Sequence, residues 1–181
     1  MFKTKLNNGC VLIIGGAKSG KSTLALHLCN DLDLKHIFIA TAEARDAEME
    51  ERIKRHRTER GEKWTTVEEP LDIAAKIDEL DGSDSVILID CLTLWLSNQF
   101  MKYEDNSEEI NRNIKELAVR LAVAKGVVVV VSNDVGMGIV PENKLAREFR
   151  DVAGYMNQTI GAVAKKVVVT FAGLPMVLKD E

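Results

Sequence analysis

The sequence predicts an α/β fold, in which helices cover both faces of a mostly parallel central sheet. Short apolar runs rich in valine and isoleucine recur along the chain, and helical patterns separate most of them. Continuous apolar runs are typical of parallel strands that are buried on both faces. The expected strands are residues 11–14, 37–40, 86–90, 127–133 and 167–173.

Two further segments are predicted to extend the sheet. "WTTVEE" (64–69) reads as a short extended piece, and "LPMVLK" (174–179) follows a Gly-Leu-Pro turn and would make an antiparallel edge strand. The polar stretch 101–109 is expected to connect two helices, with Ser107 as the N-cap of the second. A last helix is predicted to begin near Pro141. Its apolar stripe comprises Leu145, Phe149, Val152, Met156, Ile160 and Val163.

The amino-acid composition limits the classes of function that this protein can have. The 181 residues predict one domain over 1–181, and the content of 46% hydrophobic and 29% charged residues is typical of a globular protein. A net charge of -4 argues against charge-driven nucleic-acid binding. Three distant cysteines without a CxxC pair suggest neither a disulfide framework nor a zinc site, and favour a reducing cytoplasm. The apolar run near the start is too short for a membrane span or a signal peptide.

A phosphate-binding loop is the strongest local motif. "GGAKSGKS" fits G-x-x-x-x-G-K-[ST], directly after an apolar run and before a helical segment, as a P-loop NTPase requires. Its backbone amides would cradle phosphate oxygens, Lys21 would reach the β and γ phosphates, and the Ser22 hydroxyl would bind Mg²⁺. The nucleotide-binding residues of this loop are Gly15, Gly16, Ala17, Lys18, Ser19, Gly20, Lys21 and Ser22.

Asp90 ends the run "VILID" and is a candidate Walker B carboxylate for the same Mg²⁺. Its alternative role is to cap the helix that follows, and the two roles are compatible. Lys18, inside the loop, is either solvated or in contact with phosphate.

The segment "DAEMEERIKRHRTERG" predicts a basic helix between Asp46 and Gly61. Arg52, His56 and Arg60 are four residues apart, so they share one helix face. One interpretation is a solvated helix with ion pairs worth about 0.3–0.5 kcal/mol each. The other is that neighbouring cations keep His56 neutral and available as a nucleophile, and stabilise a triphosphate and its leaving pyrophosphate. His27 and His36 fit packing or surface roles.

Several longer segments resemble the bifunctional adenosylcobinamide kinase/adenosylcobinamide-phosphate guanylyltransferase family. They are "GGAKSGKS", "IATAEARDAEMEERIKRHRTERGEKW", "VEEP", "LIDCLTLWLSN", "SNDVGMGIVPENKLAREFRDVAGYMNQ" and "GLPMVLK". The resemblance implies that a nucleoside triphosphate phosphorylates adenosylcobinamide. GMP then passes from GTP through a GMP-histidine to adenosylcobinamide-phosphate, giving adenosylcobinamide-GDP. It also implies GTP and ATP as substrates, and a homotrimer.

Carried onto this chain, the resemblance makes His56 the catalytic nucleophile and Ser22 and Asp90 the Mg²⁺ ligands. Two departures are visible, since the family often has arginine where Lys18 stands and glutamate where Asp134 stands. Strand-end position supports Thr41 and Asp90 independently, because parallel sheets bind ligands beyond their carboxyl ends. The further nucleotide-binding residues implied are Thr41, Ala42, Glu43, Arg57, Thr58, Glu59, Arg60, Glu68 and Asp90.

Two other functions remain open from the residues alone. A simple P-loop small-molecule kinase would use ATP and leave His56 as a surface residue. A GTP-dependent switch would need a guanine-recognition motif such as N-K-x-D, and "NKLA" (143–146) lacks the aspartate.

Overall fold

The computed structural model describes residues 4–43, 47–104 and 106–181. The side chains at positions 48, 49, 52, 55, 56 and 59 also lie outside the described part. The strands are β1 (Gly9–Gly15), β2 (Lys35–Ala40), β3 (Trp64–Glu68), β4 (Ser85–Asp90), β5 (Val127–Asn133), β6 (Lys166–Phe171) and β7 (Leu174–Asp180). The helices are α1 (Lys21–Asn30), α2 (Ala47–Arg60), α3 (Ile73–Leu80), α4 (Leu92–Tyr103), α5 (Ser107–Ala122) and α6 (Lys144–Val163).

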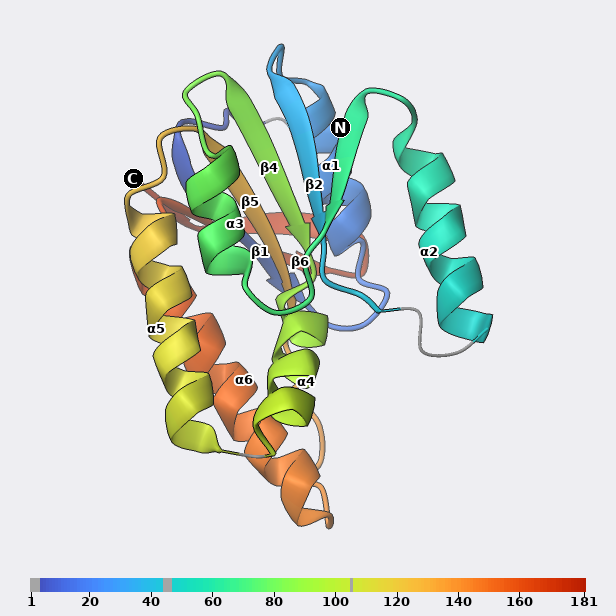
Figure 1. The fold of residues 1–181 in the computed structure, drawn as a ribbon, viewed down its shortest axis with the longest axis vertical. Helices are drawn as coiled ribbons and strands as arrows, with labels where there is room; N and C mark the ends of the chain where they lie inside the picture. The colour runs from blue at the N-terminus through green and yellow to red at the C-terminus, as the bar shows by residue number, and fades with distance from the viewer. Residues whose placement is uncertain (1–3, 44–46, 105) are drawn as a thin grey trace.

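One seven-stranded sheet forms the middle layer, in the order β3-β2-β4-β5-β1-β6-β7 (Figure 1). The first six strands in that order are parallel to their neighbours, and β7 pairs antiparallel with β6. The predicted α/β class, the mostly parallel sheet and the antiparallel edge are therefore confirmed.

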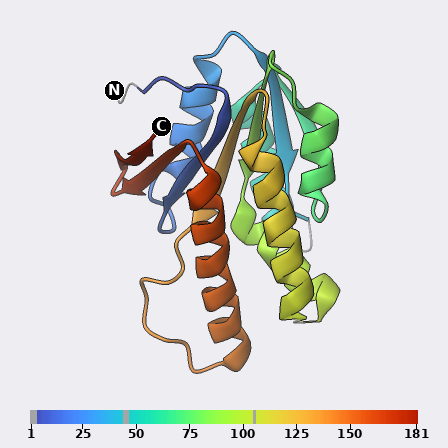
Figure 2. The same ribbon diagram turned by 90° about the vertical axis from the view of Figure 1, so that its left-hand side faces the viewer.

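Both faces of the sheet are buried, which explains the continuous apolar runs. Leu12 and Ile87 point to the face covered by α3, α4, α5 and α6, while Val11 and Leu88 point to the face covered by α1. Neighbouring residues in a strand point to opposite faces, so a strand between two helical layers has no polar side. A view turned by 90° shows α5 and α6 side by side along one face (Figure 2).

Several predicted boundaries were wrong for local reasons. β6 ends at Phe171, not at Gly173, because Ala172 and Gly173 turn the chain with φ of 52° and 79°. Helix α4 continues through 101–103 to Tyr103.

The predicted helix starts were wrong as well. Asn106, and not Ser107, caps α5, since its side chain accepts from the amide of Glu109 at 3.3 Å. Asn143 caps α6, so that helix begins at Lys144 and not near Pro141. The first turn of α6 is exposed to solvent and does not pack into the core. Leu145, predicted as part of the apolar stripe of this helix, is 47% exposed.

Candidate active site

The phosphate loop joins the end of β1 to the start of α1 and closes on its own lysine. Lys21 Nζ donates to the carbonyl of Gly16 at 2.5 Å, and Gly20 takes the left-handed conformation with φ of 96°. Lys21 is only 7% exposed. Burial lowers the pKa of Lys21, and the nearby Cys91 and Asp90 oppose that shift. Lys18 is exposed on the rim of the loop with φ of 54°.

The β6–β7 hairpin packs directly on this loop, which the sequence did not indicate. Ser19 Oγ lies 2.7 Å from Thr170 Oγ1, and the amide of Gly173 donates to the carbonyl of Ser19 at 3.1 Å. A Cβ at Gly15 would lie 2.4 Å from the carbonyl oxygen of Thr170. Only glycine fits at position 15, and the hairpin fixes the path of the phosphate loop.

The ends of three neighbouring strands, β3, β2 and β4, line up at one end of the sheet. Ala40 at the end of β2 pairs with Glu68 of β3 on one side and with Asp90 of β4 on the other. Neighbouring strands are about 4.8 Å apart, so the backbones of Glu68 and Asp90 are separated by about 10 Å. Glu68, which had no support from strand position in the sequence, lies at the same sheet edge as Asp90.

Thr41 links these strand ends to one another. Its hydroxyl donates to the carbonyl of Cys91 at 2.9 Å and accepts from the amide of Cys91 at 3.1 Å. Cys91 occupies the N-cap position of α4, so the alternative role of Asp90 as the cap is wrong. Ala42 and Glu43 follow Thr41 and are half-buried and exposed, respectively.

A buried amide in α4 holds the same region, and sequence reasoning missed it. Asn98 Nδ2 donates to the carbonyl of Thr41 at 2.8 Å and to that of Pro70 at 3.1 Å. Asn98 is 7% exposed. The sequence signal that could have identified Asn98 is an asparagine within an otherwise apolar helix. A buried amide needs hydrogen-bond partners, so such a residue is expected to anchor a neighbouring segment.

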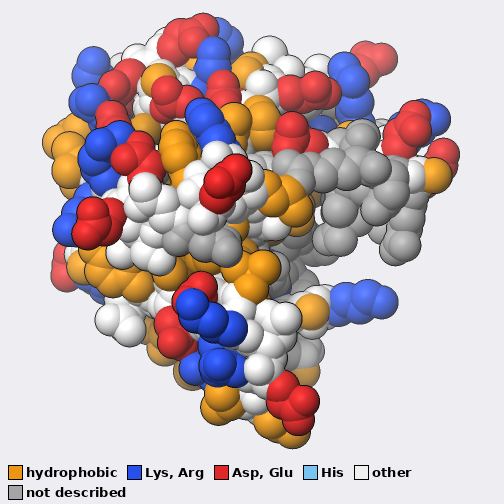
Figure 3. Space-filling view, turned by 60° about the horizontal axis from the view of Figure 1, so that its bottom comes forward, with side chains coloured by type: hydrophobic (Ala, Val, Ile, Leu, Met, Phe, Trp, Pro, Cys, Tyr) orange, Lys and Arg blue, Asp and Glu red, His pale blue; other side chains and the backbone are white. Residues whose placement is uncertain are grey.

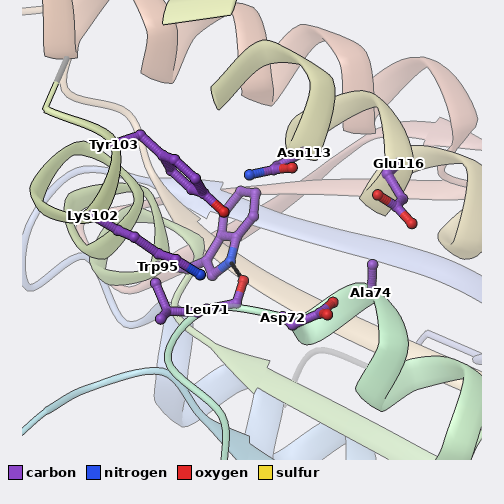
Figure 4. A pocket seen from close by; sticks show the side chains of 8 residues that line it. All are labelled: Leu71, Asp72, Ala74, Trp95, Lys102, Tyr103, Asn113 and Glu116. Carbon is purple, nitrogen blue, oxygen red and sulfur yellow. Dashed lines mark hydrogen bonds between the residues drawn. The ribbon is translucent and has the colours of Figure 1, made fainter. Parts of the chain in front are cut away.

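A small pocket of 100 Å³ lies behind this network (Figure 4). Trp95 stands at its centre and donates from Nε1 to the carbonyl of Leu71 at 2.7 Å. Gln99 Nε2 donates to the same carbonyl at 2.9 Å. None of the predicted site residues lines the pocket, which belongs to the anchoring of the loop between β3 and α3. Its walls are Leu71, Asp72, Ala74, Trp95, Lys102, Tyr103, Asn113 and Glu116.

The basic helix α2 reaches the sheet through its last residue. The Arg60 guanidinium lies 3.6 Å from the centre of the Phe38 ring, and its Nη2 is 3.4 Å from Thr66 Oγ1. Burial lowers the pKa of Arg60, and Asp90 opposes the shift while Arg57 adds to it. The charge of Asp90 therefore favours the charged forms of both Arg60 and Lys21.

For the other predicted site residues of α2, the structure describes the side chains of some and not of others. Arg57 and Thr58 are exposed, and they line a 370 Å³ cavity together with Gly61, Glu62, Trp64 and Thr66. Position 56 lies within α2, but the His56 side chain, like that of Glu59, lies outside the described residues. Lys54 pairs with Glu50 at 3.8 Å and with Glu51 at 3.7 Å, as a solvated helix surface would.

The remaining histidines have packing or surface surroundings. His36 is buried, with Nε2 2.9 Å from the carbonyl of Cys29 and its ring against the edge of Trp64. His27 lies on the partly exposed surface of α1, 4.0 Å from Asp31.

Two elements at this end of the sheet carry oxygen groups of the kind that Mg²⁺ prefers. Ser22 follows Lys21 in the first turn of α1, and Asp90 ends β4. Mg²⁺ takes few protein ligands and completes its shell with phosphate and water, so a hydroxyl and a carboxylate fit it. Among the described residues there is no cluster of three or more His, Cys, Asp or Glu side chains that would hold a metal without such help. Over the same residues, no helix is long and apolar enough to cross a membrane.

The molecular surface at the lower end of the molecule mixes charge with hydrophobic side chains. Figure 3 brings this end forward, and Lys and Arg side chains are seen there beside acidic and hydrophobic ones.

Solved structures share the fold at low sequence identity. The RadB recombinase has a TM-score of 0.54 at 15% identity, and the match covers 91% of this chain and 75% of that one. An ATPase from the type III secretion system has a TM-score of 0.55 at 12% identity, over 89% of this chain and 50% of that one. These similarities confirm a P-loop NTPase fold.

Sequence relatives are much more similar. A protein from Pseudomonas aeruginosa named bifunctional adenosylcobalamin biosynthesis protein CobP is 42% identical, over 94% of this chain and 97% of its own. The Escherichia coli protein named CobU with the same description is 36% identical, over 93% and 99%. The family model described as cobinamide kinase / cobinamide phosphate guanyltransferase matches residues 11–178. The chain therefore belongs to the CobU family of cobinamide kinases and cobinamide phosphate guanyltransferases.

Proposed function

We propose that this chain catalyses both reactions, phosphorylation of adenosylcobinamide and GMP transfer from GTP to adenosylcobinamide-phosphate. One observation carries the proposal beyond family membership. Arg60 at the end of the basic helix lies 3.6 Å from the Phe38 ring of β2. Ala40 at the end of that strand pairs with Asp90 of β4, whose charge also opposes the lowering of the Lys21 pKa by burial. Two neighbouring strands thus serve the phosphate loop and the helix that carries position 56.

In the kinase step, residues Gly15–Ser22 hold the triphosphate. The hydroxyl of the aminopropanol arm attacks the γ-phosphorus, the bond to the β–γ bridging oxygen breaks, and the nucleoside diphosphate leaves while the hydroxyl proton passes to water. Lys21 releases the Gly16 carbonyl and donates instead to the β and γ phosphates, where it stabilises the developing charge. Ser22 and Asp90 would hold Mg²⁺, which would supply positive charge to the phosphates when bound.

In the guanylyl step, a ring nitrogen of His56 attacks the α-phosphorus of GTP. The bond to the α–β bridging oxygen breaks and pyrophosphate leaves. A phosphate oxygen of adenosylcobinamide-phosphate then attacks the same phosphorus, the P–N bond breaks, and His56 regains its free imidazole while adenosylcobinamide-GDP forms. Arg57 and Arg60 supply positive charge next to the triphosphate, and Thr41, Ala42, Glu43, Thr58, Glu59 and Glu68 complete the nucleotide site.

The same proposal covers the domain extent, the nucleotide substrates, the oligomeric state and the location of the enzyme. We place one catalytic domain over residues 1–181, GTP and ATP as nucleotide substrates, and a homotrimer in the cytoplasm. It needs neither a nucleic acid nor a membrane. The net charge of -4 supports the first of these exclusions.

The test is covalent labelling. The protein is incubated with Mg²⁺ and GTP labelled at the α-phosphate, and the adduct is tested for the acid lability and base stability of a phosphoramidate. We expect label on the wild type and on His27→Ala, a matched control for a histidine on a partly exposed helix surface, and no label on His56→Ala.

Absence of label from a folded wild type that still phosphorylates cobinamide would contradict the guanylyl step. A simple P-loop kinase would then be the better description. The phosphorylation assay alone tests the kinase step, because it needs no adduct on the protein.

A further inference from the structure

An apolar pocket separates α4 from the start of α6. Its volume of 530 Å³ falls within the usual range for small-molecule sites. Phe100 and Phe149 form its floor, with ring centres 5.4 Å apart. Two polar side chains line it, and that of Asn143 is engaged in capping α6. The lining residues are Ser97, Phe100, Met101, Asn143, Leu145, Ala146 and Phe149.

Two large apolar side chains in the lining of this pocket are exposed to solvent. Met101 is 58% exposed and Leu145 47%. Outside the pocket lining, the loop between β5 and α6 carries three more exposed apolar side chains, Met137, Ile139 and Val140, at 83%, 97% and 59% exposure. Grouped exposure of this kind marks a binding surface, because isolated apolar residues are common on protein surfaces but clusters are not.

The pocket is tied to the phosphate loop from two sides. Helix α4 begins one residue after Cys91, and Phe100 lies eight residues along it, about 12 Å from its first residue at 1.5 Å per residue. On the other side, the loop that leads to α6 starts at Asp134, whose amide donates to the carbonyl of Gly15 at 3.0 Å. Thr93 in the first turn of α4 accepts from the amide of Asn133 at 2.9 Å. Both walls of the pocket are therefore connected to the backbone beside the phosphate loop, one through α4 and the other through the loop that leads to α6.

We propose that this pocket binds an edge of the corrin ring of cobinamide and directs the aminopropanol arm toward the phosphate loop. The inference rests on the proposed function, since it names where the second substrate of that site lies. A corrin ring carries methyl groups and apolar faces within a periphery of amide arms. Its apolar edge matches the pocket, while the amides remain in water and the hydroxyl-bearing arm spans the distance along α4.

The test places a charge on each exposed wall of the pocket. Leu145→Asp and Met101→Asp are compared with Val119→Asp, which changes a residue of α5 that is 58% exposed, as Met101 is. Burying such a side chain against a ligand is worth about a tenfold change in affinity. We expect KM for cobinamide to rise about tenfold in both pocket variants, with KM for the nucleotide unchanged, and no rise in Val119→Asp.

Three further measurements separate this inference from the proposed function. Labelling by GTP needs no corrinoid, so the pocket variants are expected to take up label like the wild type. Equilibrium dialysis of adenosylcobinamide, followed by its visible absorbance, measures binding without catalysis and is expected to weaken by the same factor. Light scattering measures the mass of the assembly, which is expected to stay that of the wild type.

An unchanged dissociation constant for adenosylcobinamide in Leu145→Asp and Met101→Asp overturns the inference, whether or not the wild type is active. A change in mass in the pocket variants also overturns it, because a second copy of the chain would then cover this surface. If the wild type binds cobinamide at the pocket but neither phosphorylates it nor takes up label, the proposed function fails and the pocket stands.

Discussion

Removing the hydroxyl of Thr170 should loosen the phosphate loop without touching a nucleotide ligand. Thr170→Val keeps the side-chain shape and deletes the group that lies 2.7 Å from Ser19 Oγ. Both residues are buried, at 1% and 8% exposure, so water replaces the lost bond poorly. Ser19 Oγ still has Lys21 Nζ as a second hydrogen-bond neighbour, at 3.5 Å. The loss of unfolding free energy should therefore lie near the lower end of the range for an unsatisfied buried polar group, at about 1 kcal/mol.

That cost should appear in two assays. For a chain of this length, about 1 kcal/mol lowers Tm by about 2–4 °C. The KM for ATP should rise about fivefold, because the loop must be reordered when the triphosphate binds. Thr159→Val is the control, since it removes a hydroxyl that donates to the Tyr155 carbonyl within α6 at 2.8 Å and should leave the KM for ATP unchanged.

A double-mutant cycle with Ser19→Ala gives the refuting result. If the two hydroxyls stabilise each other, the losses in unfolding free energy should couple by at least about 0.5 kcal/mol. Additive losses, or a Thr170→Val variant with the Tm and KM of the wild type, would show that the hairpin does not position the loop.

Three other predictions follow from close contacts and burial in this structure. Gly15→Ala should abolish the native loop, because its methyl carbon would lie 2.4 Å from a backbone carbonyl, whereas Gly16→Ala meets nothing within 4 Å and should keep the Tm measured without nucleotide. Arg60→Met should lower the unfolding free energy in urea by about 0.5–2 kcal/mol, since the guanidinium leaves the Phe38 ring. Burial raises the pKa of the Cys10 thiol to about 12 from 9.0, so this thiol should make unfolding easier as pH rises above 9. Its contribution is up to about 1.4 kcal/mol per pH unit, in addition to those of the buried Cys29 and Cys91, when urea midpoints are compared between pH 8.5 and 10.5.

Two further variants test the predictions for Arg60 and for the pH dependence of unfolding. Arg57→Met removes an exposed arginine of the same helix and should leave the urea midpoint unchanged, and a loss equal to that of Arg60→Met would contradict a specific ring contact. Cys10→Ala should show a shallower decline between the two pH values, because its buried site has no thiol to ionise. Equal slopes for Cys10→Ala and the wild type would contradict the assignment of the pH dependence to this thiol.

The sequence by itself determined the features that depend on local spacing. The phosphate loop was readable because glycine, lysine and serine must occur at fixed intervals between a strand and a helix. The strands were readable because burial on both faces leaves only apolar residues. Asp90 was placed because a strand end shows as the boundary of such a run. Cap positions were less well determined, since Asn106 and Ser107 are both good caps and only the hydrogen bond distinguishes them.

Only the tertiary structure decided which strand ends meet. Strand order is set by how helices pack across the sheet, and no periodicity within a strand encodes its neighbours. Glu68 therefore reached the edge beside Asp90 through the β3-β2-β4 order, and Thr170 reached Ser19 across 151 residues of sequence. Asn98 and the pocket between α4 and α6 are likewise products of packing, because an amide or an apolar side chain acquires its role only from what the fold places against it.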